Sequence, residues 1–284
     1  CKNRQRPRFR TRWRVHKAVQ NQTRTSSESE KALIHYHGMP LSGGLSTEVS
    51  MQGKHGFVSY AHAGSVGLVA EICQSFALDN GAFSSWKSGK AFDVSGFANF
   101  VAEWHKHPNC DWYVIPDVID GDDDANAKMR ATWFKTVGAE IYGKGVPVWH
   151  LNESLDVLRY MTVAYKRIAF GSAGAYSQIG SQEWWARMSE AMDVVCDLEG
   201  RPKVKLHGLR MLDPTIFSHF PFSSADSTNV GRNCGLDTRW QGPYTIGLST
   251  KTRAMILMDR IESHASAARW NNTQAGQKNF ELIG

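Results

Sequence analysis

Three aspartates each follow a short run of strand-like residues. Asp79 follows FAL, Asp117 follows WYVIP, and Asp226 follows PFSSA. If these runs are parallel strands of one barrel, their carboxyl ends meet at one face and the three carboxylates converge there. Carboxylates a few ångströms apart do not all ionise easily, so one can carry a proton while another acts as a nucleophile.

Such a pair is suited to breaking a bond at the anomeric carbon of a sugar. One carboxylate attacks, a covalent glycosyl-enzyme forms, and a second acceptor resolves it. Spacing alone leaves open whether that acceptor is water, a sugar or a nucleobase. The prediction requires Asp226 and Asp79, far apart in the chain, to face one another across a shared cavity at the mouth of the barrel.

Further polar and aromatic residues follow the other strand-like runs. The candidates for substrate binding are Asn80, Phe83, Asp117, His150, Gly171, Ser172, His207 and Gly208. Backbone N–H groups near Gly171 could bind a carbonyl or a phosphate, and Phe83 or Trp86 could stack on a base. Structural alternatives remain: 79–81 as a tight turn, 226–229 as a helix N-cap, and 171–174 as a close strand-to-helix turn.

Other chemically suggestive residues have a structural interpretation. The acidic run 120–124 is more typical of a helix N-terminus than of a metal site. His35 and His37 could point into the barrel as a second shell, but satisfied core histidines are the favoured interpretation. Four tryptophans are expected to pack the helix ring: Trp104, Trp133, Trp184 and Trp185.

The spacing of strand-like and helix-like segments predicts the fold. Eight strands are expected at 33–38, 57–62, 76–81, 112–117, 146–151, 167–172, 203–209 and 221–227. Between them, apolar residues recur every three to four positions, as in Val94, Phe97 and Val101, and a last helix is expected at 250–270. The alternation predicts an α/β fold, a single-domain (β/α)₈ TIM barrel, irregular at its first and seventh crossovers. A doubly wound open sheet is the alternative.

The charge is concentrated at the amino end. The net charge is +6, yet the first 24 residues hold nine basic residues and no acid. We interpret 1–30 as a basic arm for phosphate backbones, with a solvated tail as the alternative, 31–270 as the barrel and 271–284 as a polar tail. The arm's candidate contacts are Arg4, Arg6, Arg8, Arg10, Arg12 and Arg14. With no membrane-spanning run, no signal pattern and no CxxC spacing, the expected location is the cytosol of a bacterium or a phage-infected cell.

The motifs taken together resemble a known family. The chain resembles tRNA-guanine transglycosylases, and more closely their DNA-modifying relatives, the DpdA-like 7-deazaguanine transglycosylases. The resemblance spans about residues 34–233. It rests on LDNGAF (78–83), PDVIDGD (116–122), VWHLNE (148–153), FGSAG (170–174), KLHGLR (205–210) and SADSTNVGRN (224–233).

The resemblance implies a role for each matching residue. Asp226 matches the nucleophile, and Asp79 matches the general acid/base of an Asp-Ser-Gly-Gly motif. Asp117 matches the aspartate that reads the guanine edge, and His150 stands where the tRNA enzymes usually have a base-binding glutamine. Gly171 and Ser172 match the loop that meets the base carbonyl, and Arg232 and Asn233 resemble a phosphate-contacting stretch.

Two departures from the tRNA enzymes bear on the substrate. Their zinc-binding CxCxxC motif is missing, since no cysteine follows Cys234, so we predict no metal and no cofactor. Ala82 replaces the second glycine of the motif that contains Asp79, and the chain is shorter than the tRNA enzymes. The expected partners are DNA and a free 7-deazaguanine such as preQ0, with a homodimer or helper proteins left open. The alternatives are the same exchange on tRNA, a glycoside hydrolase barrel, or a DNA-binding protein without activity.

Overall fold

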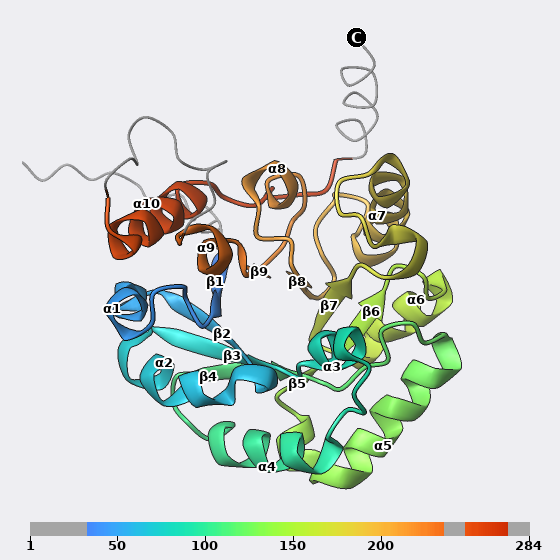
Figure 1. Ribbon diagram of the computed structural model, residues 1–284. Coiled ribbons are helices and arrows are strands. Elements are labelled where there is room, and N and C mark those ends of the chain that lie inside the picture. Colours follow the sequence, from blue (N-terminus) through green and yellow to red (C-terminus); the bar gives the residue numbers. More distant parts are fainter. Residues whose placement is uncertain (1–32, 236–247, 272–284) are drawn as a thin grey trace, which may run out of the picture. The chain divides into compact units, whose positions relative to one another are not determined.

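A computed structural model describes residues 33–235 and 248–271 of the chain, which all lie in one compact unit. Its centre is a parallel sheet in the order β5-β4-β3-β2-β1-β9-β8-β7-β6 (Figure 1). The strands are β1 Ile34–Met39, β2 His55–Ser59, β3 Ser75–Asp79, β4 Cys110–Val114, β5 Gly145–Val146, β6 Val148–His150, β7 Arg167–Gly171, β8 Lys205–Gly208 and β9 Ser224–Ser227. All eight predicted strands are present, and the fold is a TIM-like barrel.

The fifth predicted strand is divided at Pro147. Its first part, β5, pairs with β4, and its second part, β6, pairs with β7. Proline has no N–H to donate to a ladder, so a strand tends to break there. The two ends of the sheet order are therefore joined by one short segment, 145–150, which makes the barrel nearly closed.

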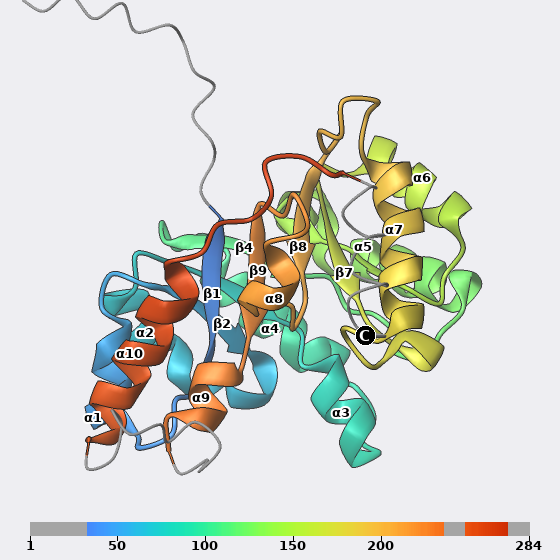
Figure 2. The same ribbon diagram turned by 90° about the horizontal axis from the view of Figure 1, so that it is seen from above.

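Helices surround the strands (Figures 1 and 2). They are α1 Leu45–Glu48, α2 Val66–Ile72, α3 Ala82–Ser88, α4 Val94–Trp104, α5 Asp123–Tyr142, α6 Leu155–Ala164, α7 Gln182–Val195, α8 Pro214–Phe217, α9 Asn229–Asn233 and α10 Thr250–Glu262. The predicted irregularities are present, because the first crossover holds only a four-residue helix and a short 3₁₀ turn at Val49–Met51, and α8 has four residues.

Several boundaries differ from the sequence-based expectation, among them the following. Strand β2 ends at Ser59, and residues Tyr60–Ser65 form a 3₁₀ segment kinked at His62. Helix α10 ends at Glu262, short of the expected residue 270. Strand β9 begins at Ser224, three residues after the expected start. These limits depend on the pattern of backbone hydrogen bonds, which apolar composition does not mark.

Two apolar clusters lie on the two faces of the sheet. Inward-pointing residues fill the barrel: Tyr36, Phe57, Ala77, Trp112, Val114, Val146, Val148 and Ala169. The larger cluster packs the outer face against the helices and includes Trp133 and Trp184, with Trp104 and Trp185 partly buried beside it, as predicted for the helix ring.

His35 and His37 alternate with the inward-facing Tyr36 on β1, so both point away from the barrel interior. His37 is fully buried and hydrogen-bonds Glu262 of α10, while His35 meets the carbonyl of His264. They are outward-facing structural residues and not a second shell of the site. Asp122 caps α5, and Asp123 and Asp124 lie in its first turn, as predicted for the acidic run.

Candidate active site

A cavity of about 860 Å³ opens at the carboxyl ends of the strands. The cavity is lined by ten of the predicted site residues: Asp79, Asn80, Phe83, Asp117, His150, Gly171, Ser172, Asp226, Arg232 and Asn233. They come from the ends of β3, β6, β7 and β9 and from the segments that follow β3, β4, β7 and β9. The volume of the cavity lies in the range of pockets that enclose small organic ligands.

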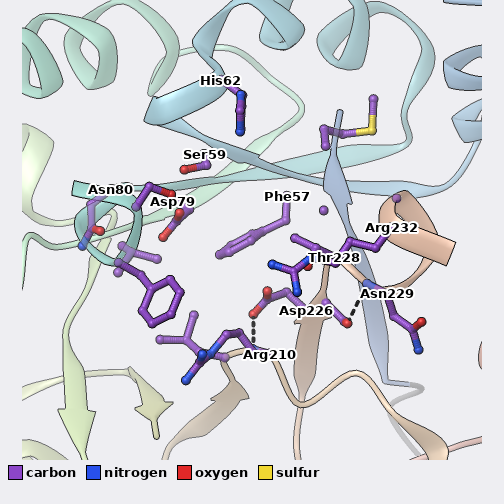
Figure 3. Close-up of a pocket in the computed structure, with 18 of the residues that line it drawn as sticks. Phe57, Ser59, His62, Asp79, Asn80, Arg210, Asp226, Thr228, Asn229 and Arg232 are labelled. Atoms are coloured by element: carbon purple, nitrogen blue, oxygen red, sulfur yellow. Dashed lines mark hydrogen bonds between the residues drawn. The ribbon is translucent and has the colours of Figure 1, made fainter. Parts of the chain in front are cut away.

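Asp79 and Asp226 lie on opposite sides of this cavity, with Phe57 between them in the view of Figure 3. Asp79 is the last residue of β3, and Asp226 is the third residue of β9. In the sheet only β2 and β1 separate these two parallel strands, so their carboxyl ends lie at the same mouth, although the two residues are far apart in the chain.

The carboxyl group of Asp79 is held partly neutral. Burial, with the charges of Asp226 and Asp117, raises its pKa from 3.8 to about 7, while the hydrogen bond from the Gly81 N–H and the nearby Ser59 hydroxyl oppose the rise. A carboxyl group with a pKa near 7 can both give and take a proton at neutral pH. Asp79 therefore has the proton affinity that a general acid/base needs.

The turn after Asp79 leads from β3 into α3 and also places hydrogen-bond donors beside the site carboxylates. Gly81 has a φ of 74°, the left-handed conformation that the tight-turn interpretation requires, and its N–H donates to Asp79 Oδ2 over 3.2 Å. Asn80 donates to Asp117 Oδ1 over 2.6 Å and to the Ile115 carbonyl. The tight-turn and active-site interpretations of 79–81 are thus compatible.

Asp117 and His150 form a buried pair at one wall. His150 Nε2 lies 2.7 Å from Asp117 Oδ2. Burial alone would lower the pKa of His150, but the hydrogen bond and charge of Asp117 raise it above its ordinary value. Asp117 therefore stabilises the protonated form of the His150 ring. The lone pairs of Asp117 that these contacts leave unused can accept hydrogen bonds from a ligand.

Gly171 makes room for this histidine. A Cβ atom at Gly171 would lie 2.6 Å from His150 Nδ1, closer than such atoms approach in real structures. Ser172 accepts from Trp184 Nε1 over 2.9 Å, which holds its side chain against the outer core. The loop 171–174 is followed by a 3₁₀ turn at Gly174–Tyr176, so the expected close turn is present and also lines the cavity.

Asp226 does not act as the cap of α9, because that position belongs to Thr228. Asp226 as a residue is only 5% exposed. Oδ1 accepts the backbone N–H of Arg210 over 3.0 Å and lies 3.2 Å from His207 Nε2. The structure thus buries Asp226 as a hydrogen-bonded carboxylate that still lines the cavity.

Two predicted substrate-binding residues, His207 and Gly208, do not line the cavity. His207 is fully buried and reaches the cavity only through Asp226. Gly208 faces the outer core, where an added Cβ would meet Met211 and Phe222 at 2.9 Å. Alternation along β8 explains both positions, since neighbouring residues point to opposite faces.

Arg232 is exposed on α9 at the rim of the cavity, and Asn233 hydrogen-bonds Asn229. The six predicted arginines at Arg4, Arg6, Arg8, Arg10, Arg12 and Arg14 lie outside the described residues.

Arg210 is a site residue that the sequence analysis did not single out. Its φ of 60° is uncommon for a residue other than glycine, and such backbone strain gathers at functional sites. The guanidinium donates to the Ser172 carbonyl over 2.8 Å and lies 4.6 Å from the centre of the Phe83 ring. The sequence signal that could have pointed to Arg210 is its position at the end of the KLHGLR motif. Residue types alone do not reveal that its backbone is left-handed.

Glu153, next to the site, is a second residue that the sequence analysis did not single out. It is fully buried, accepts the His150 N–H over 2.8 Å, and has a pKa that burial raises to about 7.

No group of three or more histidine, cysteine, aspartate or glutamate side chains within 33–235 and 248–271 is arranged to hold a metal ion. Over the same ranges, no helix has the length and hydropathy needed to cross a bilayer.

Comparisons with known proteins assign no family to the chain. No family model matches it, and no curated protein matches it. A solved structure from Aquifex aeolicus VF5, described as "Structural study of Project ID", aligns with a TM-score of 0.44 at 12% identity, covering 82% of this chain and 91% of that one. At that level of similarity the alignment says nothing about chemistry.

Proposed function

We propose that the protein is a base-exchange transglycosylase that replaces guanine in DNA with a 7-deazaguanine. The observation that carries the proposal is the pairing of Asp226 and Asp79 across one cavity. Asp226 is a carboxylate that accepts the backbone N–H of Arg210, and Asp79 is a carboxyl group with a pKa of about 7. A carboxylate nucleophile facing a carboxyl group that can give and take a proton is the equipment for displacement at an anomeric carbon.

The proposed reaction has two displacements. A target nucleotide flips out of the stack into the cavity. Asp226 attacks C1′, the C1′–N9 bond breaks, and Asp79 protonates the departing guanine. A 7-deazaguanine then enters, gives its N9 proton to Asp79 and attacks C1′, which releases Asp226. Two inversions retain the configuration, and neither ATP nor a redox cofactor is needed.

The cavity walls fit a purine base. Phe57, Phe83 and Leu209 supply apolar surface, and Asp117 offers acceptors for the N–H groups of guanine. An acceptor pair at that edge would reject adenine, which presents no ring N–H there. His150 resembles the base-binding glutamine of the tRNA enzymes in position. Its Nε2 lies 2.7 Å from Asp117 Oδ2, and this contact holds Asp117 in place.

DNA is the proposed substrate because the chain lacks the zinc-binding cysteines of the tRNA enzymes: no cysteine follows Cys234. Arg232 at the rim and the basic residues at 1–24 would supply phosphate contacts that add affinity more than sequence preference. If they do, log affinity should fall with log salt by about 0.9 per phosphate neutralised.

Exchange of labelled guanine tests the proposal. Purified protein is incubated with radiolabelled guanine and either duplex DNA, single-stranded DNA or tRNA, and incorporation into polymer is counted. We expect incorporation into DNA, none with Asp226→Asn, and strong loss with Asp79→Asn. Asp197→Asn is the matched control, because its carboxylate binds backbone N–H groups after α7, away from the cavity. Incorporation into tRNA alone would move the proposal to the tRNA reaction, and incorporation into neither would remove it.

A further inference from the structure

His207 lies beneath the cavity floor, enclosed by aromatic side chains. It is fully buried, and its ring centre lies 4.7 Å from that of Trp112 and 5.6 Å from that of Phe57. Burial lowers the pKa of His207, and the hydrogen bond and charge of Asp226 oppose this only in part. The imidazole is therefore neutral at pH 7 and carries a single N–H.

The partners of His207 fix where that N–H is. Nδ1 lies 2.8 Å from the hydroxyl oxygen of Ser224, and Nε2 lies 3.2 Å from Asp226 Oδ1. An ionised carboxylate only accepts hydrogen bonds, so Nε2 must carry the proton, while Nδ1 accepts from the Ser224 hydroxyl. Ser224, His207 and Asp226 thus form a directed chain of hydrogen bonds that ends on one carboxylate oxygen.

The two oxygens of Asp226 are therefore not equivalent. Oδ1 receives both the His207 N–H and the backbone N–H of Arg210, whose left-handed φ of 60° directs it there. From the part of the chain that the structure describes, no hydrogen bond reaches Oδ2. Because Asp226 lines the cavity, Oδ2 is the oxygen left for a substrate.

We propose that His207 is a positioning residue that holds Asp226 by Oδ1, so that Oδ2 attacks C1′, and that it drives release of the glycosyl group in the second step. The inference rests on the proposed base exchange. In the first step the Oδ2–C1′ bond forms, the C1′–N9 electron pair goes to guanine N9, and Asp79 supplies its proton. In the second step N9 of the incoming base loses its proton to Asp79 and bonds C1′, and the Oδ2–C1′ pair returns to Oδ2.

The hydrogen bonds to Oδ1 change in strength through this cycle. In the free enzyme Oδ1 shares a full negative charge, whereas in the glycosyl ester it is an ordinary carbonyl oxygen. Hydrogen bonds to charged acceptors are roughly twice as strong as neutral ones. The His207 N–H therefore favours the free carboxylate over the ester, which speeds departure of Asp226 and keeps the covalent intermediate from accumulating.

The test measures the ratio of covalent adduct to free enzyme. Protein and a guanine-containing oligonucleotide are brought to equilibrium with a fixed concentration of free guanine, quenched with denaturant and separated on a denaturing gel. His207→Phe fills a similar aromatic space without a donor, and we expect the ratio to rise about tenfold while turnover falls. His207→Gln keeps an N–H near the Nε2 position and should restore the ratio.

A purely structural role for His207 predicts the opposite, because partly unfolded protein lowers adduct and turnover together. An unchanged or lower ratio in folded His207→Phe overturns the inference. Should that variant not fold, Ser224→Ala weakens the same chain without disturbing the aromatic cage, and a smaller rise in the ratio is expected. Ser223→Ala is its control, since that hydroxyl donates to the Leu206 carbonyl instead, and a rise in Ser224→Ala no greater than in this control counts against the inference.

The failure of this inference and that of the proposed function are distinguishable. If the wild-type protein forms an adduct and His207→Phe leaves the ratio unchanged, the function stands and the positioning role is wrong. If no nucleic acid gives an adduct with wild-type protein, the function fails. In that case ¹⁵N NMR of histidine-labelled protein decides on His207: a neutral ring protonated at Nε2 at pH 7 supports the hydrogen-bonded chain, and a cation or an Nδ1-protonated ring refutes it.

Discussion

Replacing Asp79 by asparagine should stabilise the fold at high pH and not at low pH. The folded protein holds the carboxyl group of Asp79 at a pKa of about 7, against an ordinary 3.8. Between these values the folded state binds a proton that the unfolded state has released, so stability falls as the pH rises from about 4 through 7. Asparagine has the same shape and no charge, so it escapes this cost.

The size of the effect follows from the difference in proton affinity. The interval from 3.8 to about 7 corresponds to roughly 4 kcal/mol at 1.36 kcal/mol for each pKa unit. Asp79 is partly open to solvent in the cavity, and screening there reduces the value. We therefore expect Asp79→Asn to gain roughly 2–4 kcal/mol over wild type at pH 8 and little at pH 4.

Urea unfolding of both proteins at pH 4, 6 and 8, followed by circular dichroism, measures the difference directly. Glu153, whose pKa burial also raises to about 7, is present in both proteins and cancels. Asp197→Asn, which removes a carboxylate outside the cavity, should show no such gain at pH 8. A stability difference for Asp79→Asn that is the same at all three pH values would refute the reasoning that Asp79 is held partly neutral.

Three further predictions concern the wall, the stacking surface and the outer helix. Gly171→Ala places a Cβ atom 2.6 Å from His150 Nδ1, so it should destabilise the fold by about 1–3 kcal/mol and weaken guanine binding in calorimetry; unchanged binding would mean that His150 does not shape the pocket. Phe83→Ala should raise the Kd for single-stranded DNA by roughly tenfold or more in fluorescence anisotropy, the loss of one stacked base, and an unaltered Kd would exclude stacking on Phe83. Burial alone would raise the pKa of Glu262, but hydrogen bonds from His37 and Lys54 lower it to about 2. Glu262→Gln should therefore destabilise at pH 7 by about 1–3 kcal/mol, and this loss should shrink as the pH falls from about 4.5 towards 2; a loss that persists at pH 2.5 would contradict the ion pair.

The positions of the strands could be predicted because one pattern of residue types recurs along the chain. The strands are short, mainly apolar runs, and several of them end at or just before a polar residue such as Asp79 or His150. Parallel strands place those polar residues at one mouth. For that reason Asp79, Asp117 and Asp226 could be expected in one cavity before any coordinates. The division of the fifth strand at Pro147 could not be placed in the same way, because it depends on which neighbour each half pairs with.

The details that decide chemistry at the site depend on tertiary packing. His207 was expected to touch a substrate, yet alternation on β8 turns its side chain inward under Asp226, where aromatic rings surround it. The left-handed backbone of Arg210 and its contact with Phe83 involve segments far apart in the chain, and residue types alone do not specify either. The high proton affinity of Asp79 likewise comes from burial and neighbouring charges.

Trapping the intermediate and locating the modified residue tests the central claim most directly. Protein and a guanine-containing DNA oligonucleotide are mixed, denatured and digested, and the peptides are sequenced by mass spectrometry. The account predicts a deoxyribosyl ester on the side chain of Asp226, with loss of free guanine and no adduct in Asp226→Asn. An ester on Asp79 or another residue, or a full yield of adduct in Asp226→Asn, would contradict it.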